Sequence, residues 1–140
     1  MLIIRGFICI VFVFLFSTIY SNKKEDVVFQ LKKSSKKDTS QINSYNRLSK
    51  EIVEYNLREA LKLARNGLIL SEKIGYLPGI AESYKQLGSI YLSLNNYPAA
   101  LKNYLSLKET AIKLNNSTLL SESYNNIARV YINTKEYVTA

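Results

Sequence analysis

The sequence has no histidine and no tryptophan, and its single cysteine, Cys9, lies in an apolar run near the N-terminus. Without histidine, the chain has no imidazole to bind a metal ion or to act as a general acid or base. If the segment that holds Cys9 is removed, the remaining chain can form neither a disulfide nor a thiolate site. The sequence also contains no glycine-rich phosphate loop and no spaced set of carboxylates. We therefore expect a protein that is not an enzyme, with no cofactor and no metal site.

Proline and glycine are also scarce, with two prolines and five glycines among 140 residues. Because both residues interrupt helices, their scarcity favours helices joined by short turns. Hydrophobic residues make up 47% of the chain and charged residues 21%, which suits a globular fold. The length allows one such domain at most. The composition thus predicts a single all-α domain.

Residues 1–21 differ in composition from the rest of the chain. One basic residue, Arg5, precedes an apolar run over residues 6–16, and small and polar residues follow. This order is that of a secretory signal peptide, and the run is shorter than the roughly 20 residues of a membrane span. We expect export, with cleavage after Ser21. The alternative is an uncleaved signal anchor, since Ile19 could extend the run; either would place the rest of the protein outside the cytoplasm, in the periplasm or anchored to the membrane.

Residues 22–41 are dense in charge, with six lysines and three acidic residues, and contribute +3 to the formal net charge of +8. Lysines dominate this stretch: Lys23, Lys24, Lys32, Lys33, Lys36 and Lys37. A segment with high charge and few apolar residues is typical of a flexible, mostly disordered linker. The alternative is a basic strip, over residues 23–37, that rests on an anionic membrane surface. Charge alone would also permit nucleic-acid binding, but we do not expect it, because export would separate this segment from nucleic acid.

From Ile42 onward, apolar residues recur at intervals of three and four, which is the period of an amphipathic helix. Gly75 and Asn115 can take the left-handed conformation that closes a helix. Ser117 or Thr118 can cap the last helix, and a turn is predicted over residues 134–136. The helices predicted in this way cover residues 42–52, 56–74, 79–94, 98–114 and a stretch from 117 or 118 to about 133.

Part of residues 81–100 returns in residues 121–140. The matching positions are Tyr84, Leu87, Gly88, Tyr91 and Ala100 in the first copy, and Tyr124, Ile127, Ala128, Tyr131 and Ala140 in the second. Gly75 and Asn115, where two of the predicted helices end, are separated by the same number of residues as the two copies. Gly88 and Ala128 are small where one helix must approach its partner closely, and Ala100 is small where the second helix packs back. A fixed period of this kind is the signature of a repeat array.

Together with Tyr104, these positions resemble the tetratricopeptide repeat, in a variant with long helices and a longer period. The resemblance implies an α–α superhelix of stacked helical hairpins, in which the first helix of each unit lines a concave groove. Because Ala140 matches Ala100 at the first turn of a second helix, we expect the sequence to be the front part of a longer protein or the product of a truncated gene. The units would be residues 42–78, which diverge from the pattern, 79–116, which are complete, and 117–140, which are truncated.

The resemblance also implies where a peptide would bind, because the helix faces not used for packing would line the groove. Asn126 matches a position where many members of the family have an asparagine that grips a peptide backbone. Lys85 and Arg129 could hold a carboxylate. A solvated helix face without any ligand is the alternative for these positions. The candidate groove residues are Glu82, Lys85, Gln86, Ser89, Asn125, Asn126 and Arg129.

Two functions fit these features. The first is an exported protein-interaction scaffold that holds a peptide or protein segment in the groove. The second is the sensory or interaction region of a membrane-bound bacterial signalling protein, a histidine kinase or helix-turn-helix regulator, whose output domain is missing from this chain. A span of about 20 apolar residues followed by such an output domain would distinguish the second from the first.

Overall fold

The computed structural model describes residues 39–138, which form five helices and no strand. The predicted all-α fold class is therefore confirmed for this part of the chain. The predictions for the signal segment, residues 1–21, and for nearly all of the basic linker lie outside the described residues. The helices are α2 (Thr39–Ile52), α3 (Leu57–Ile74), α4 (Leu77–Ser93), α5 (Tyr97–Lys113) and α6 (Ser117–Val138).

Four of the helices begin at evenly spaced positions, Leu57, Leu77, Tyr97 and Ser117. The turns between them share one geometry. In each, a single residue has a positive φ: 68° at Gly75, 55° at Asn95 and 51° at Asn115. The backbone N–H of the residue after it donates a hydrogen bond to the carbonyl five residues earlier, as from Tyr76 to Ser71 and from Asn96 to Tyr91. These are Schellman turns, which glycine and asparagine favour because they tolerate the left-handed conformation, and they confirm the predicted stops at Gly75 and Asn115.

Asparagine side chains cap three of the helices. The Asn56, Asn96 and Asn116 side-chain oxygens accept hydrogen bonds from the backbone N–H three residues later, at 3.1, 3.2 and 2.9 Å. Each bond satisfies one of the N–H groups that lack a partner at a helix start. The prediction that Ser117 or Thr118 caps α6 is thus wrong, because Asn116 already takes that role.

The two outer helices run further than the sequence pattern predicted. Helix α2 begins at Thr39, so the last residues assigned to the linker are helical; their polar side chains lie before the first apolar residue and gave no periodic signal. The turn predicted over residues 134–136 is wrong, because α6 continues to Val138. In the repeat register, Lys135 stands where the earlier copy has Asn95, so the residue that takes the left-handed conformation in the earlier turn has no counterpart here.

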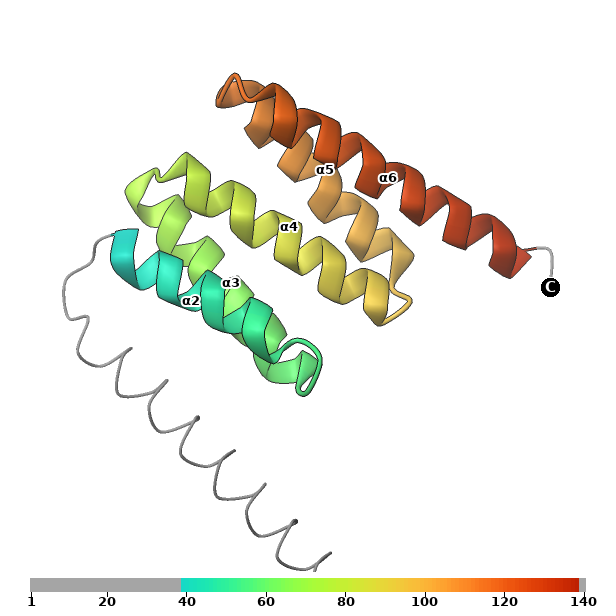
Figure 1. The fold of residues 1–140 in the computed structure, drawn as a ribbon, viewed down its shortest axis with the longest axis horizontal. Coiled ribbons are helices and arrows are strands. Elements are labelled where there is room, and N and C mark those ends of the chain that lie inside the picture. The colour runs from blue at the N-terminus through green and yellow to red at the C-terminus, as the bar shows by residue number, and fades with distance from the viewer. Residues whose placement is uncertain (1–38, 139–140) are drawn as a thin grey trace, which may run out of the picture. The chain divides into compact units, whose positions relative to one another are not determined.

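Each helix packs against its neighbours in sequence, and α2 also contacts α4 directly. Figure 1 shows the helices following one another in chain order from α2 to α6, with α3 and α5 behind the layer of α2, α4 and α6. One core cluster joins α3 and α4 around Ala60, Ala64, Leu87 and Ile90. A second joins α4, α5 and α6; its buried members are Ala81, Leu92, Ala100, Tyr104, Leu107 and Val130. The described helices therefore share continuous apolar packing, with α4 in contact on both sides.

Gly88 marks the closest approach between α4 and α5. A Cβ atom at this position would lie 2.5 Å from the Tyr104 ring, nearer than packed side chains tolerate. Gly88 is thus small because the Tyr104 ring occupies the space, which confirms the predicted close approach. Ala100 is fully buried, as predicted.

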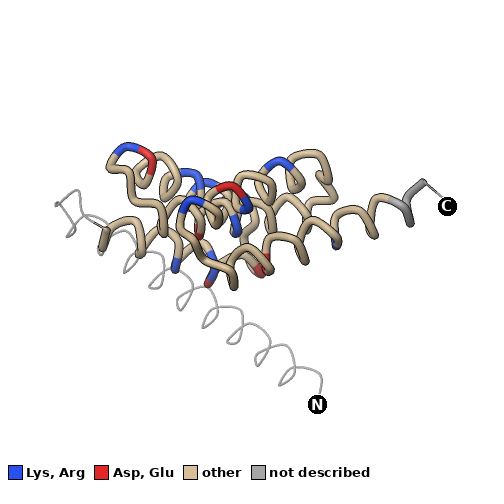
Figure 2. Tube along the Cα trace, turned by 90° about the horizontal axis from the view of Figure 1, so that it is seen from above, with Lys and Arg blue, Asp and Glu red and all other residues tan. Residues whose placement is uncertain are grey.

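Charged residues of both signs are interspersed along the described helices, as Figure 2 shows. Over residues 39–138, twelve basic residues stand against eight acidic ones. Within residues 39–138, none of the helices combines the length and apolar character that crossing a membrane requires.

Candidate functional site

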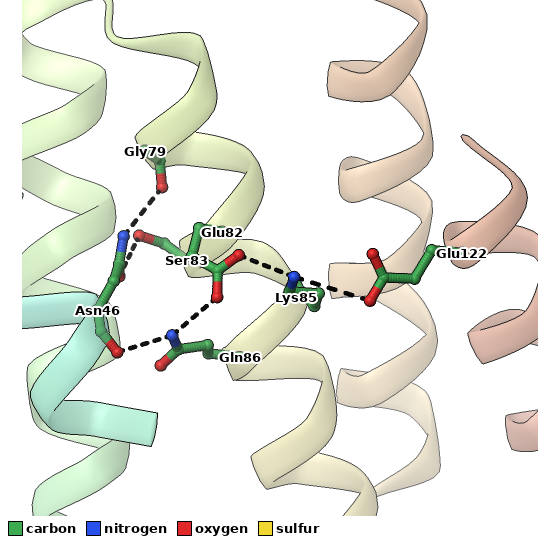
Figure 3. A network of polar contacts seen from close by, with 7 residues as sticks. All are labelled: Asn46, Gly79, Glu82, Ser83, Lys85, Gln86 and Glu122. Atoms are coloured by element: carbon green, nitrogen blue, oxygen red, sulfur yellow. Dashed lines mark hydrogen bonds and ion pairs between the residues drawn. The ribbon is translucent and has the colours of Figure 1, made fainter. Parts of the chain in front are cut away.

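A cluster of polar side chains links the alternate helices α2, α4 and α6 (Figure 3). At its centre lies Asn46 of α2, a buried residue on the same stripe as Ile42 and Ser49. The Asn46 amide donates to the Gly79 carbonyl at 3.4 Å, and its oxygen accepts from the Ser83 hydroxyl at 2.9 Å. A buried amide is stable only when its polar atoms have partners, and α4 supplies them. The cluster so joined, called the polar cluster below, consists of Asn46, Gly79, Glu82, Ser83, Lys85, Gln86 and Glu122.

Gln86 extends the polar cluster along α4. Its side-chain nitrogen donates to the Asn46 backbone carbonyl at 2.7 Å and to a Glu82 carboxylate oxygen at 3.1 Å. Both partners are acceptors, so the amide must present its nitrogen to them. The other end of the amide, Oε1, is then a buried acceptor with no partner in the described part of the chain. The residue as a whole is 8% exposed.

Lys85 connects the polar cluster to α6. Its ammonium nitrogen lies 2.8 Å from one Glu82 oxygen and 3.7 Å from one Glu122 oxygen, and its side chain is 30% exposed. Glu122 stands in the second copy of the repeat where Glu82 stands in the first, so the lysine is held between equivalent carboxylates of two units. A ligand carboxylate would therefore have to compete with Glu82 and Glu122 for the lysine.

The pair shifts the acid–base equilibria of both side chains. Burial by itself would raise the pKa of Glu82, but hydrogen bonds from Lys85 and Gln86, with the charge of Lys85, hold the pKa below its ordinary value. Burial by itself would lower the pKa of Lys85, but its hydrogen bonds and charge interactions with Glu82 and Glu122 hold it above its ordinary value. Both side chains are therefore charged at neutral pH.

Tyr104 of α5 brings a second group of polar residues together. Burial raises the pKa of its hydroxyl, while the charge of Arg129 and a hydrogen bond with the Ser89 side chain act in the opposite direction. The phenol thus lies near Ser89 of α4 and Arg129 of α6. Arg129 in turn donates to the Asn126 side-chain oxygen at 3.3 Å.

The seven predicted groove residues therefore fall into three groups. Glu82, Lys85 and Gln86 belong to the polar cluster, and Gln86 is buried against α2 rather than open to solvent. Ser89 and Arg129 interact with the Tyr104 hydroxyl, and Asn126 accepts a hydrogen bond from Arg129. Asn125 is exposed on α6.

Two residues of this region were not among the candidates predicted from the sequence. Asn46 lies on the apolar stripe of α2 and precedes Gln86 by one repeat period. A polar residue on an apolar stripe, at the repeat position of a candidate residue, was the signal that could have identified it. Tyr104 was named only as a position of the repeat pattern; its ring lies in the core, and nothing in the sequence indicates which way its hydroxyl points.

The chemistry of this region is that of hydrogen bonding and ion pairing. Among the described residues, no group of three or more histidine, cysteine, aspartate or glutamate side chains is placed to hold a metal ion. What the region presents instead are amide, hydroxyl, ammonium and guanidinium groups on alternate helices.

Comparison with known proteins finds no match to the sequence, either among protein-family models or among curated proteins. The resemblance to the tetratricopeptide repeat therefore depends on the residues named above and on the even spacing of the helices.

Proposed function

We propose that residues 39–138 form a tetratricopeptide-like array of helical hairpins that acts as an exported, non-catalytic scaffold. In this proposal α2, α4 and α6 present one face to a peptide or protein segment, and stacked hairpins turn that face into a groove. The leader-like residues 1–21 support a location outside the cytoplasm, and the lysines of residues 23–37 would allow contact with an anionic membrane.

The observation that supports the proposal most directly is the continuity of polar side chains across these three alternate helices. Lys85 joins α4 to α6, and Gln86 joins α4 to α2. An extended peptide carries a backbone donor and acceptor at every residue, and the polar side chains on the exposed part of this face would complement it. Arg129, Asn125 and Ser89 are exposed and would make the first contacts.

A peptide-array experiment with the full-length chain tests this proposal. The chain would be applied to short extended peptides of varied composition, and affinities of the best binders would be measured by fluorescence anisotropy. Arg129→Glu should weaken binding about tenfold or more, as expected when an arginine that contacts the peptide is replaced by the opposite charge. Arg58→Glu, at an exposed arginine of α3 outside this face, is the matched control and should leave binding unchanged. If no peptide binds, or if both variants weaken binding equally, the proposal is wrong.

A further inference from the structure

The polar cluster is closed toward α2 and open toward α6. Helices α2 and α4 contact one another directly, whereas no comparable contact joins α4 and α6. Two glycines allow the close approach of α2: a Cβ atom at Gly67 would lie 2.7 Å from the Asn46 side-chain oxygen, and one at Gly79 would lie 2.7 Å from another side chain of α2. One repeat period later the same places hold Leu107 and Leu119, whose larger side chains pack between the helices and keep α6 further from α4. A ligand can therefore reach the polar cluster from its α6 side.

On that open side, Glu122 is a carboxylate with little compensation for its charge. Its side chain is 44% exposed, and one of its oxygens lies 3.7 Å from the Lys85 ammonium nitrogen. Its other oxygen points away from that ammonium group (Figure 3). Among the described residues, no other cation lies within ion-pair distance of Glu122. One face of this carboxylate is therefore available to a cation from outside the chain.

Glu82, the equivalent carboxylate of α4, takes the larger share of Lys85. Its oxygen lies 2.8 Å from the ammonium nitrogen, and its other oxygen accepts a hydrogen bond from Gln86 at 3.1 Å. Lys50 of α2 adds a further positive charge near it. Because the attraction between charges falls with distance, Lys85 compensates Glu82 more than it compensates Glu122. Glu122 thus keeps much of its capacity to attract a cation.

The polar cluster as a whole is also short of hydrogen-bond donors. Its two carboxylates share one ammonium group, and the buried Gln86 Oε1 has no donor in the described part of the chain. An ionised carboxylate can accept from several donors at once. The ligand group that complements this surface is therefore a donor with a positive charge, as the ammonium of lysine and the guanidinium of arginine are.

We propose that a peptide bound in the groove places a basic side chain against Glu122, and that this position disfavours an acidic one. The preference depends on the proposed function, since it concerns the same groove. It is the opposite of the sequence-based hypothesis that Lys85 holds a ligand carboxylate, because such a ligand would face two carboxylates that already share the lysine. Arg129 lies seven residues further along α6, about 10 Å along the helix axis, so salt largely screens its repulsion of the ligand cation.

The best-binding peptide of the array provides the probe for this preference. Versions with lysine, glutamine or glutamate at each position in turn would be titrated into the full-length chain by fluorescence anisotropy. At one position, lysine should bind about fivefold or more tightly than glutamate, with glutamine between them, as expected for attraction and repulsion at a partly exposed carboxylate. The ratio should shrink as the ionic strength rises, because salt screens such pairs.

Changes of charge in the protein assign the preference to Glu122. Glu122→Gln should reduce the ratio between the lysine and glutamate peptides to about twofold or less, and Glu122→Lys should reverse it. Glu59→Gln is the matched control and should leave the ratio unchanged. Glu59 is 41% exposed and also lies 3.7 Å from a lysine, but within α3, outside the proposed groove. Circular dichroism of each variant checks that the helices are intact.

The possible results distinguish this preference from the proposed groove itself. If a peptide binds and Arg129→Glu weakens it, but no position favours lysine or Glu122→Gln leaves the preference unchanged, Glu122 does not hold a basic side chain and the groove still stands. A position that favours glutamate, and loses that preference in Lys85→Gln, would show that the ligand displaces the carboxylates instead, and the proposal made here would be wrong. If no peptide binds, the groove and the preference are both wrong.

Discussion

Helices α4 and α6 carry related sequences, one repeat period apart, yet they have different surroundings. Leu92 of α4 is 8% exposed, whereas Ile132 of α6, at the matching position, is 58% exposed. The difference comes from the neighbours, because α4 has a helix on each side and α6 packs on α5 along one side. Similar side chains thus stabilise the fold in one place and form a surface in the other, so their substitution should have different consequences.

Truncation of the matched pair should show this difference most strongly. Leu92→Ala removes packed atoms from the core and should lower the free energy of unfolding by about 2–5 kcal/mol. Ile132→Ala removes atoms that already contact solvent and should change it by less than about 0.5 kcal/mol. Urea denaturation of both variants, followed by circular dichroism, measures the two values. Equal losses would show that the two helices do not differ as described.

Enlargement at the small positions should give the next largest effect. Gly88→Leu would force a side chain into the Tyr104 ring and should destabilise the protein by about 1–3 kcal/mol. Ala128→Leu, at the equivalent position on an exposed face, should cost almost nothing because leucine is also a good helix former. The same denaturation experiment compares them, and a neutral Gly88→Leu would contradict the close approach of α4 and α5.

The turn after α4 should be sensitive to residue type in a way that the corresponding part of α6 is not. Asn95 has a φ of 55°, a conformation that costs most residues roughly 1–2 kcal/mol. Asn95→Ala should therefore lower the melting temperature, whereas Asn95→Gly should largely preserve it. Lys135→Ala, within a continuous helix, serves as the control. If alanine and glycine at position 95 behave alike, the left-handed turn does not contribute as argued.

The smallest expected effect is that of the ion pair between α4 and α6. Because the pKa of Glu82 is lower in the folded protein than its ordinary 4.5, its contribution to stability is present above that value. The contribution is lost as the pH falls below 4.5 and through the folded-state pKa. Glu82→Gln should cost under about 1 kcal/mol at neutral pH, since the pair is partly solvated, and the difference from the native chain should shrink in acid. Glu59→Gln, at a more exposed pair on α3, is the control. A difference that is independent of pH would argue against the pairing.

The sequence predicted the helices well because their stability follows local rules. The apolar period placed all five helices, and Gly75 and Asn115 placed two of their ends. Pro78 and Pro98 lie in the first turns of α4 and α5, where a missing backbone N–H costs nothing. The error at residues 134–136 arose from extending the repeat to a place where no glycine or asparagine stops the helix. A pattern predicts a turn reliably only where the residues that make the turn recur as well.

The candidate site was less predictable because its contacts join residues that are far apart in the chain. Gln86 was predicted to line an open groove, with a solvated face as the alternative, but its amide reaches the Asn46 carbonyl of another helix, α2. Helical period gives the direction of a side chain from its own helix axis, not what a neighbouring helix puts in front of it. Asn46 and the Tyr104 hydroxyl were missed for that reason, since their roles depend on the contacts between α2, α4 and α6.

The order of contacts bears on how this chain acquires its structure. Every substantial contact between the described helices joins neighbours in sequence, apart from α2 with α4, which are separated by one helix. Proteins rich in such short-range contacts fold quickly. A newly made chain therefore has nearly all the partners of a helix within reach soon after that helix emerges, and α2–α4 can assemble before α6 has been synthesised.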